Sequence, residues 1–171
     1  MERLDKREVD MLMQIVSDHY PNQQIFHISD GNNDLHDYLF ELTKRRGYEY
    51  DLRIVGDPFE CSFDPKDHPG CTIEELDLGR KAFNKHARLY EYAFVTLEDH
   101  ILEDDFQLFL QKIYRMMKNS GIVVLMPKKD GRFRERIDTM LEDGYFVAIN
   151  HIDLFDGYDI VNARKMHGWH R

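Results

Sequence analysis

Short apolar runs alternate with amphipathic stretches along the chain, and this alternation limits the fold more than any other feature. Four runs have the length of strands buried on both faces: residues 24–29, 50–56, 92–97 and 122–126. Three stretches repeat apolar residues at helical spacing: residues 35–46, 106–117 and 133–143. Strands and helices that alternate in this way form a mostly parallel sheet with helices on both faces. The sequence therefore predicts an α/β fold.

The two ends of the chain complete the pattern. Apolar residues at helical spacing predict an N-terminal helix over about residues 2–20. Two strand-like stretches, 145–152 and 158–165, are too near each other for a helical crossover, so they must pair antiparallel. No linker-like or repetitive segment interrupts the 171 residues. We therefore predict one domain over residues 1–171.

The middle of the chain is its least regular part. Three prolines among polar and aromatic residues make residues 57–70 a predicted loop. Thr72 and Glu75 then have the spacing of a capping box, which favours a helix through about Lys85. Residues 71–78 are equally consistent with a short strand, so the sequence leaves helix and strand open here.

The composition narrows the class of protein. Acidic residues outnumber basic ones by 32 to 23, and the formal charge of −9 repels nucleic-acid phosphates. Two cysteines, Cys61 and Cys71, are too few for the disulfide framework of a secreted protein. No apolar run approaches the roughly 20 residues of a membrane-spanning helix. We expect a cytoplasmic protein that binds neither nucleic acid nor a membrane.

Two long segments carry a resemblance to a known family. Residues 90–126, YEYAFVTLEDHILEDDFQLFLQKIYRMMKNSGIVVLM, are similar to the fourth strand, the next helix and the turn into the fifth strand of class I S-adenosylmethionine-dependent methyltransferases. Residues 140–165, MLEDGYFVAINHIDLFDGYDIVNARK, resemble that family's final helix and closing strands. The resemblance implies a Rossmann-like, mostly parallel sheet with an antiparallel last strand. It also implies S-adenosylmethionine as cofactor and methyl transfer as activity.

The family's cofactor loop corresponds to QIFHISDGNND, residues 24–34. Its motif runs acidic, apolar, Gly, any, Gly, any, Gly, and only the middle glycine is kept. His27 takes the acidic position, where we expect a core histidine with a backbone partner. Glycine lets the chain turn sharply and bring bare backbone against a ligand. The resemblance assigns four residues of this loop to the cofactor: Ser29, Asp30, Gly31 and Asn33.

The lost glycines weaken this site without excluding it. A left-handed backbone costs most residues about 1–2 kcal/mol, although Asn33 tolerates it well. Such a loss lowers affinity roughly 5- to 30-fold, which an enzyme can survive. Asp34 and Asp37 fall in the first turn of the next helix, where they would repel a phosphate. A ligand with a positive centre therefore fits better than a dinucleotide.

Two further carboxylates correspond to cofactor contacts of the family. Asp57 follows the second strand, where a carboxylate can accept hydrogen bonds from the two ribose hydroxyls. The same residue, before Pro58, is equally suited to start a turn. Asp77 would contact adenine only if residues 71–78 are a strand, and the capping-box interpretation argues against that.

The candidate catalytic residues follow the fourth strand, at the edge where this fold presents reacting groups. His100 could take a proton from the methyl acceptor, with Glu98 or Asp99 orienting the imidazole. The simpler interpretation is that Asp99 caps a turn and His100 is solvated. Small-molecule methyl transfer often needs only positioning, which favours the simpler interpretation.

A basic run follows the fifth strand and could attract an anionic substrate, although such runs are more often the solvated start of a helix. It comprises Lys128, Lys129, Arg132 and Arg134. Two groups of potential metal ligands lack the fourth donor and the paired spacing of a tetrahedral site. They are Cys61, His68 and Cys71, and His167 with His170. No metal site is predicted.

Two hypotheses of function follow from these patterns. The first is an S-adenosylmethionine-dependent methyltransferase of unknown substrate with a weakened cofactor site. The second is a non-catalytic protein that keeps the fold for binding or scaffolding, with a small molecule or a protein as partner. It predicts that side chains around residues 29–33 fill the cofactor cleft, and an open cleft would count against it. Self-association is compatible with both.

Overall fold

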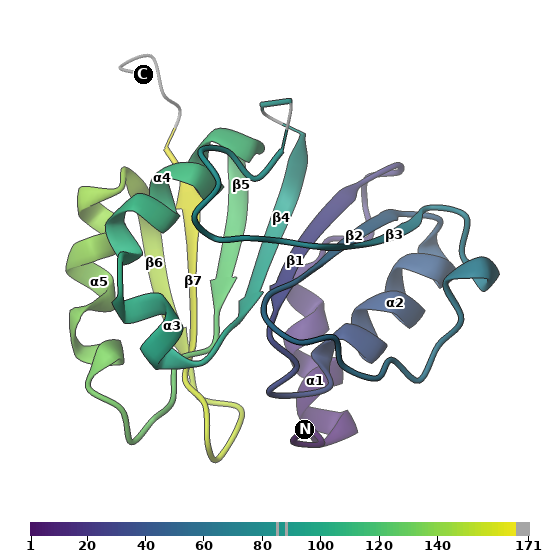
Figure 1. Cartoon of the computed structure of the whole chain (residues 1–171), viewed down its shortest axis with the longest axis horizontal. Helices are drawn as coiled ribbons and strands as arrows, with labels where there is room; N and C mark the ends of the chain where they lie inside the picture. The colour runs from purple at the N-terminus through teal and green to yellow at the C-terminus, as the bar shows by residue number, and fades with distance from the viewer. Residues whose placement is uncertain (85, 88, 167–171) are drawn as a thin grey trace.

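The computed structural model describes residues 1–84, 86–87 and 89–166, which form one sheet of seven strands. The strands are β1 (Gln24–Ser29), β2 (Glu49–Ile54), β3 (Cys71–Glu75), β4 (Tyr90–Thr96), β5 (Met117–Leu125), β6 (Phe146–Ile152) and β7 (Ile160–Lys165). Their order across the sheet is β3-β2-β1-β4-β5-β7-β6 (Figure 1). β1 to β5 pair in parallel, and β7 is antiparallel to both β5 and β6. The mostly parallel sheet with an antiparallel last strand is thus confirmed.

Helices cover both faces of the sheet, as the alternation of elements predicts. They are α1 (Lys6–Leu12), α2 (Leu35–Arg46), α3 (Asp99–Glu103), α4 (Phe106–Met116) and α5 (Phe133–Asp143), with short 3-10 turns η1 (Met13–Ile15) and η2 (Pro65–Asp67). The side chains of α1 and α2 pack in one core, and those of α3, α4 and α5 pack in a second core on the opposite face. None of the helices among the described residues is long and apolar enough to cross a membrane.

The N-terminal helix is shorter than predicted. Asp5 caps α1 by accepting hydrogen bonds from the backbone N–H groups of Arg7 and Glu8. After α1 the chain makes one 3-10 turn, and Val16 then takes an extended backbone conformation that ends the helical region. The helix predicted over residues 2–20 therefore occupies only about half of that span. Val16 is itself buried, so packing on the sheet stops the helix there.

β1 and α2 have the bounds that the sequence predicts. Five of the six residues of β1 are buried, because β1 pairs with β2 on one side and β4 on the other. Leu35, Leu39 and Phe40 form the apolar side of α2 that packs on this face of the sheet. Gly47 ends the helix in a left-handed conformation with φ of 69°.

Residues 71–75 form a strand, which decides between the helix and the strand that the sequence left open. β3 pairs in parallel with β2, which satisfies the backbone groups that a helix would have satisfied internally. A buried ion pair supports this edge: Arg53 donates two hydrogen bonds to Asp51, and its guanidinium lies 3.0 Å from Glu74 on β3. Tertiary pairing has therefore overridden the local capping signal.

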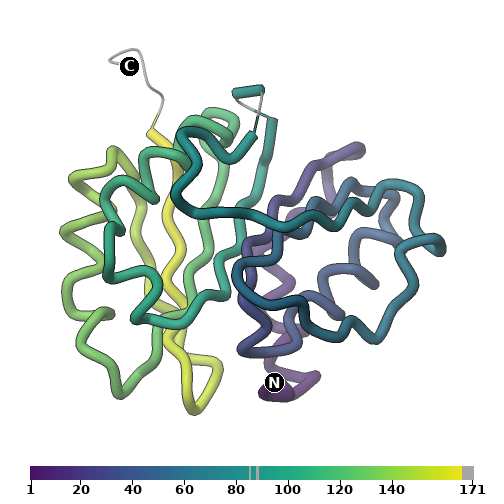
Figure 2. The backbone as a smooth tube through the Cα atoms, viewed as in Figure 1, coloured from purple at the N-terminus to yellow at the C-terminus, as the bar shows by residue number. Residues whose placement is uncertain are grey.

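The connection from β3 to β4 contains no helix within its described residues. Residues 76–84, 86–87 and 89, which we call the strap, cross the face of the sheet as an irregular segment (Figure 2). Leu76 and Phe83 anchor the strap in the core, and Lys112 Nζ donates a 2.8 Å hydrogen bond to the Leu78 carbonyl. Parallel strands are usually joined by a helix that packs on the sheet. The described residues of the strap supply no such helix on this face.

A histidine on β6 joins this strand to its neighbours through two carboxylates. His151 Nδ1 lies 2.7 Å from Asp159, and Nε2 lies 2.7 Å from Asp138 on α5. The hydrogen bond to Asp159, and then that to Asp138, raise the pKa of His151 despite partial burial. The charged imidazole is therefore favoured in the folded protein.

We predict that His151 stabilises the fold at acidic pH and loses this contribution as the pH rises. A folded-state pKa above the unfolded value stabilises the protein fully below about pH 6.5 and no longer above the folded pKa. Urea unfolding of wild type and His151→Gln across this range should show a stability difference that shrinks as the pH increases. Parallel stability curves would contradict the prediction.

Candidate functional site

The parallel strands β1, β2, β4 and β5 end on the same side of the sheet. The loops that follow their carboxyl ends form the candidate site. The strand order reverses between β1 and β4, since β1 leads to β2 on one side and the chain returns to β4 on the other. In open α/β sheets ligands bind in the crevice at such a reversal. The predicted cofactor loop, residues 29–33, therefore lies where a ligand would bind.

Gly31 is in contact with an aromatic side chain of the same protein. Its φ of +80° is a left-handed conformation that favours glycine. A Cβ built on Gly31 would lie 2.6 to 2.9 Å from three atoms of the Phe59 side chain. The bare backbone that would face a ligand thus faces Phe59, whose ring centroid also lies 4.9 Å from that of His36.

The segment that carries Phe59 is held against α2. Phe63 stacks on Phe40 with ring centroids 3.9 Å apart, and the Ser62 N–H donates a 3.1 Å hydrogen bond to Asp37. His68 Nε2 lies 3.1 Å from the Thr43 hydroxyl near the end of the segment. The predicted loop over residues 57–70 therefore packs along α2. These contacts hold Phe59 in its position. The sequence offered no signal for this role of Phe59.

The loops on the two sides of the strand reversal are joined by direct hydrogen bonds. The carboxylate of Asp30 accepts a 2.8 Å hydrogen bond from the Glu98 N–H, beyond β4. The Asn32 side-chain amide donates a 3.1 Å hydrogen bond to the Thr96 carbonyl at the end of β4. Burial raises the pKa of Asp30, although the N–H groups of Glu98 and Asn32 oppose this. These bonds join the two loops across the strand reversal.

His27 is fully buried in β1, as predicted, but its partners are not backbone groups. Nδ1 lies 2.7 Å from the Tyr50 hydroxyl on β2, and Nε2 lies 2.8 Å from the Thr96 hydroxyl on β4. Burial lowers the pKa of His27 well below its usual value, so the imidazole is neutral. The expected backbone partner is wrong because hydroxyls on the neighbouring strands reach both ring nitrogens.

Several polar atoms of the β1–α2 turn have no hydrogen-bond partner. Among the described residues five buried side-chain polar atoms are unpartnered, and four of them belong to Asn32, Asn33 and His36. Two of the four are the ring nitrogens of His36, although Nε2 lies 3.3 Å from an Asp37 carboxylate oxygen. Burial lowers the pKa of His36, and Asp37 and the backbone of Glu60 and Asn33 oppose this. Unpartnered buried groups require an explanation, such as water, an ion or a ligand. The turn therefore retains hydrogen-bonding capacity beside Phe59.

The predicted catalytic residues are not brought together around His100. Glu98 forms a 2.8 Å ion pair with Lys128, and Asp99 accepts a 3.2 Å hydrogen bond from the Lys128 N–H. Burial raises the pKa of Asp99. His100 is exposed in the first turn of α3, and within the described residues no hydrogen bond joins it to either carboxylate. Their catalytic role stays a prediction.

The other predicted cofactor carboxylates are solvent-exposed. Asp57 lies beyond the end of β2, and Asp77 folds into a local turn by accepting a 2.9 Å hydrogen bond from the Gly79 N–H. The strand at 71–75 meets the condition that we set for an adenine contact by Asp77. Roles for Asp57 and Asp77, like those of Ser29, Asp30, Gly31 and Asn33, stay predictions.

The remaining candidates are the basic run after β5, the cysteines and the histidines near the C-terminus. In the basic run, Lys128 pairs with Glu98 and Lys129 pairs with Asp153. No three potential metal ligands gather among the residues that the structure describes. Both cysteines are free thiols. His167 and His170 lie outside the described residues.

Sequence comparison gives no relatives, whereas structural comparison gives many. No protein-family model matches the chain, and no curated protein does so either. The CurJ carbon methyltransferase matches with a TM-score of 0.68 and 12% identity over 90% of this chain and 51% of its own. The 1,6-didemethyltoxoflavin-N1-methyltransferase of Burkholderia thailandensis, with bound S-adenosylhomocysteine, matches with a TM-score of 0.69 and 12% identity over 94% of this chain and 77% of its own.

A further match is not named as a methyltransferase. The [4+2]-cyclase SpnF has a TM-score of 0.67 and 12% identity, over 95% of this chain and 81% of its own. The chain spans about half the length of several methyltransferases that it matches, such as CurJ at 51%. At this identity the matches establish the fold alone. The chain has the class I methyltransferase fold, and its function must be argued from the site.

We predict that the contact between Gly31 and Phe59 accounts for much of the cost of Gly31→Ala. In wild type the substitution adds an overpacking cost of about 1–3 kcal/mol to a left-handed backbone cost of about 1–2 kcal/mol. Phe59→Ala removes the two ring atoms at 2.6 and 2.7 Å but keeps the Cβ at 2.9 Å. In this background the overpacking cost should therefore be smaller, while the backbone cost remains. Urea unfolding of the two single variants and the double variant measures this coupling. Equal costs in both backgrounds would show that Phe59 does not contact Gly31.

Proposed function

We propose that this chain is a non-catalytic protein of the methyltransferase fold that binds partners and whose own side chains occupy the cofactor cleft. The observation that carries the proposal is the ring of Phe59 against Gly31, at 2.6 Å from the position of a Cβ. A ligand that used the bare backbone of this turn would collide with that ring. The filled cleft is what the second hypothesis of function predicts.

Two further contacts support the same proposal. The bonds from Asp30 and Asn32 to the loop after β4 hold the two sides of the crevice together. His27 satisfies both of its ring nitrogens within the sheet, so the position that is acidic in the family offers no charge to a ligand. The residues of this turn do not fit S-adenosylmethionine while Phe59 is in place, and we derive no methyl-transfer step from them.

The second candidate is an S-adenosylmethionine-dependent methyltransferase of unknown substrate. It is favoured by the buried Oδ1 atom of Asn32, which lacks a hydrogen-bond partner and which a ligand could satisfy if Phe59 moved away. Gly31 also keeps the left-handed conformation that a close backbone approach requires. In this case S-adenosylmethionine would supply the methyl group, and Ser29, Asp30, Gly31, Asn33 and Asp57 would hold it.

A cytosolic location belongs to the same proposal. Burial raises the pKa of Cys61 and of Cys71 to about 11, so both thiols are protonated at neutral pH. Protonated, half-buried thiols are poor nucleophiles. The proposed location rests on the two cysteines being free thiols, as is typical of a reducing compartment.

We predict that neither S-adenosylmethionine nor S-adenosylhomocysteine stabilises the wild-type protein. A ligand present at about 100 times its dissociation constant adds about 2.7 kcal/mol, which raises the melting temperature of a domain of this size by several degrees. Thermal melts with either compound at millimolar concentration should shift by less than about one degree. Isothermal titration checks the result independently.

Phe59→Ala serves as the matched variant in the same melts. A shift in wild type would overturn the non-catalytic proposal and support the methyltransferase. A shift only in Phe59→Ala would show that the turn can still bind the cofactor and that Phe59 excludes it, which supports the proposal for the wild-type chain. Absence of a shift in both would argue against the methyltransferase.

A further inference from the structure

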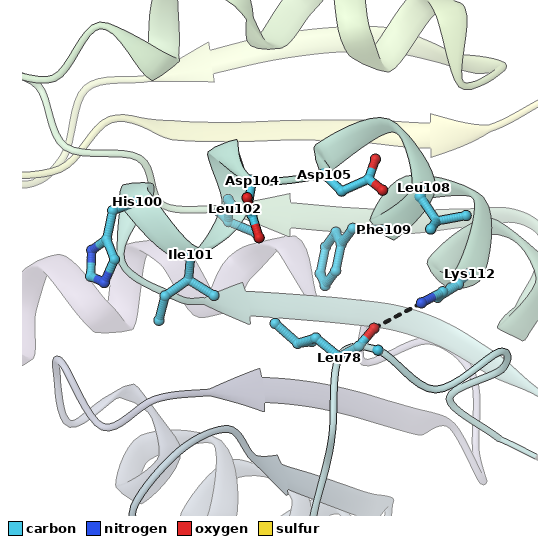
Figure 3. Close-up of a pocket in the computed structure, with 10 residues that line it drawn as sticks. Leu78, His100, Ile101, Leu102, Asp104, Asp105, Leu108, Phe109 and Lys112 are labelled. Atoms are coloured by element: carbon cyan, nitrogen blue, oxygen red, sulfur yellow. Dashed lines mark hydrogen bonds between the residues drawn. The ribbon is translucent and has the colours of Figure 1, made fainter.

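A hollow of about 530 Å³ lies between the strap and the helices α3 and α4, away from the cofactor turn (Figure 3). The strap, which contains no helix in its described residues, forms one wall of the hollow through Leu78 and Gly79. Its volume falls within the roughly 300–1,000 Å³ range of small-molecule pockets. We call it the strap groove, and its lining is Leu78, Gly79, His100, Ile101, Leu102, Asp104, Asp105, Leu108, Phe109 and Lys112.

The inner surface of the strap groove is mainly apolar. Leu78 from the strap, Ile101 from α3 and Phe109 from α4 provide aliphatic and aromatic surface (Figure 3). Leu108 at the rim is 43% exposed, which makes it one of the few large apolar side chains that remain in contact with solvent. Such a surface favours a ligand with an apolar body.

The charged groups of the strap groove favour a positive ligand. Asp104 and Asp105 are exposed where α3 meets α4, and among the described residues neither carboxylate has a Lys, Arg or His nitrogen within 4.0 Å. Asp105 occupies the N-cap position of α4 but makes no capping hydrogen bond with its side chain. Its carboxylate is therefore available to a ligand.

The one ammonium group in the lining does not neutralise these carboxylates. Lys112 is 8% exposed, and its Nζ donates to the Leu78 carbonyl and lies 5.2 Å from the ring centroid of Phe83. His100 stands at the opposite end of the groove, on α3 (Figure 3). The carboxylates of Asp104 and Asp105 thus face the groove without a basic partner, in a chain whose formal charge is −9.

We propose that the strap groove binds a small organic cation, an amine with an apolar or aromatic body. The apolar surface would hold the body, and the carboxylates of Asp104 and Asp105 would attract the ammonium group. Anionic ligands are disfavoured by the same carboxylates. This site goes beyond the proposed function, because it assigns a ligand class to a groove that is lined by His100 but by none of residues 29–33.

The test uses three probes with the same aromatic body and different charge: 2-phenylethylamine, 2-phenylethanol and 3-phenylpropionate. Binding is followed by backbone NMR shifts of the full chain at about pH 7.5, where the amine is protonated. The amine should bind roughly fivefold or more tightly than the alcohol, as two exposed ion pairs allow. Its shifts should map to α3, α4 and residues 78–79, and not to residues 29–33.

Charge variants separate a local site from the general field of an acidic protein. Asp104→Asn/Asp105→Asn removes the two carboxylates at exposed positions and should weaken amine binding roughly fivefold. Glu142→Gln removes an exposed carboxylate on α5, outside the groove, and should leave binding unchanged. Equal binding of amine and alcohol, an equal effect of both variants, or absence of amine shifts at about 10 mM would overturn the proposal.

Discussion

The parallel pairing of β1 with both β2 and β4 is the constraint on which the rest of the structure depends. It buries β1 between two neighbouring strands and brings the carboxyl ends of β1, β2 and β4 to the same side of the sheet. His27 strengthens this arrangement from within, because its two ring nitrogens contact hydroxyls on the two neighbouring strands. A neutral imidazole between two hydroxyls satisfies all three groups in a place where an unpaired carboxylate would be costly.

The turn after β1 keeps the left-handed glycine, yet Phe59 lies against it, and Asp30 and Asn32 bond to the segment at and beyond the end of β4. In our proposal these contacts take the place of a cofactor. Meanwhile, the strap between β3 and β4, which contains no helix in its described residues, forms one wall of a groove beside α3 and α4. A cyclase among the structural matches shows that this fold supports more than one chemistry.

Much of the fold could be predicted from the sequence, because strands and helices of this type have strong local periodicity. β1, α2, α4, α5 and the antiparallel pair at the end match the predicted elements closely. The failures lie where local signals compete with tertiary contacts. Thr72 and Glu75 have capping-box spacing, yet pairing with β2 makes this segment a strand.

The candidate site was harder to predict than the fold. The sequence, with its resemblance to the methyltransferase family, predicted that Gly31 lies in a ligand-binding turn. It did not decide whether the loss of two motif glycines only weakens cofactor binding or abolishes it. Only the tertiary structure decided that Phe59, 28 positions further along the chain, lies against this turn. It also decided that His100 lines a hollow beside α4, whereas Glu98 and Asp99 contact Lys128. Local sequence determines backbone periodicity, whereas which side chain fills a crevice depends on contacts between segments that are distant in sequence.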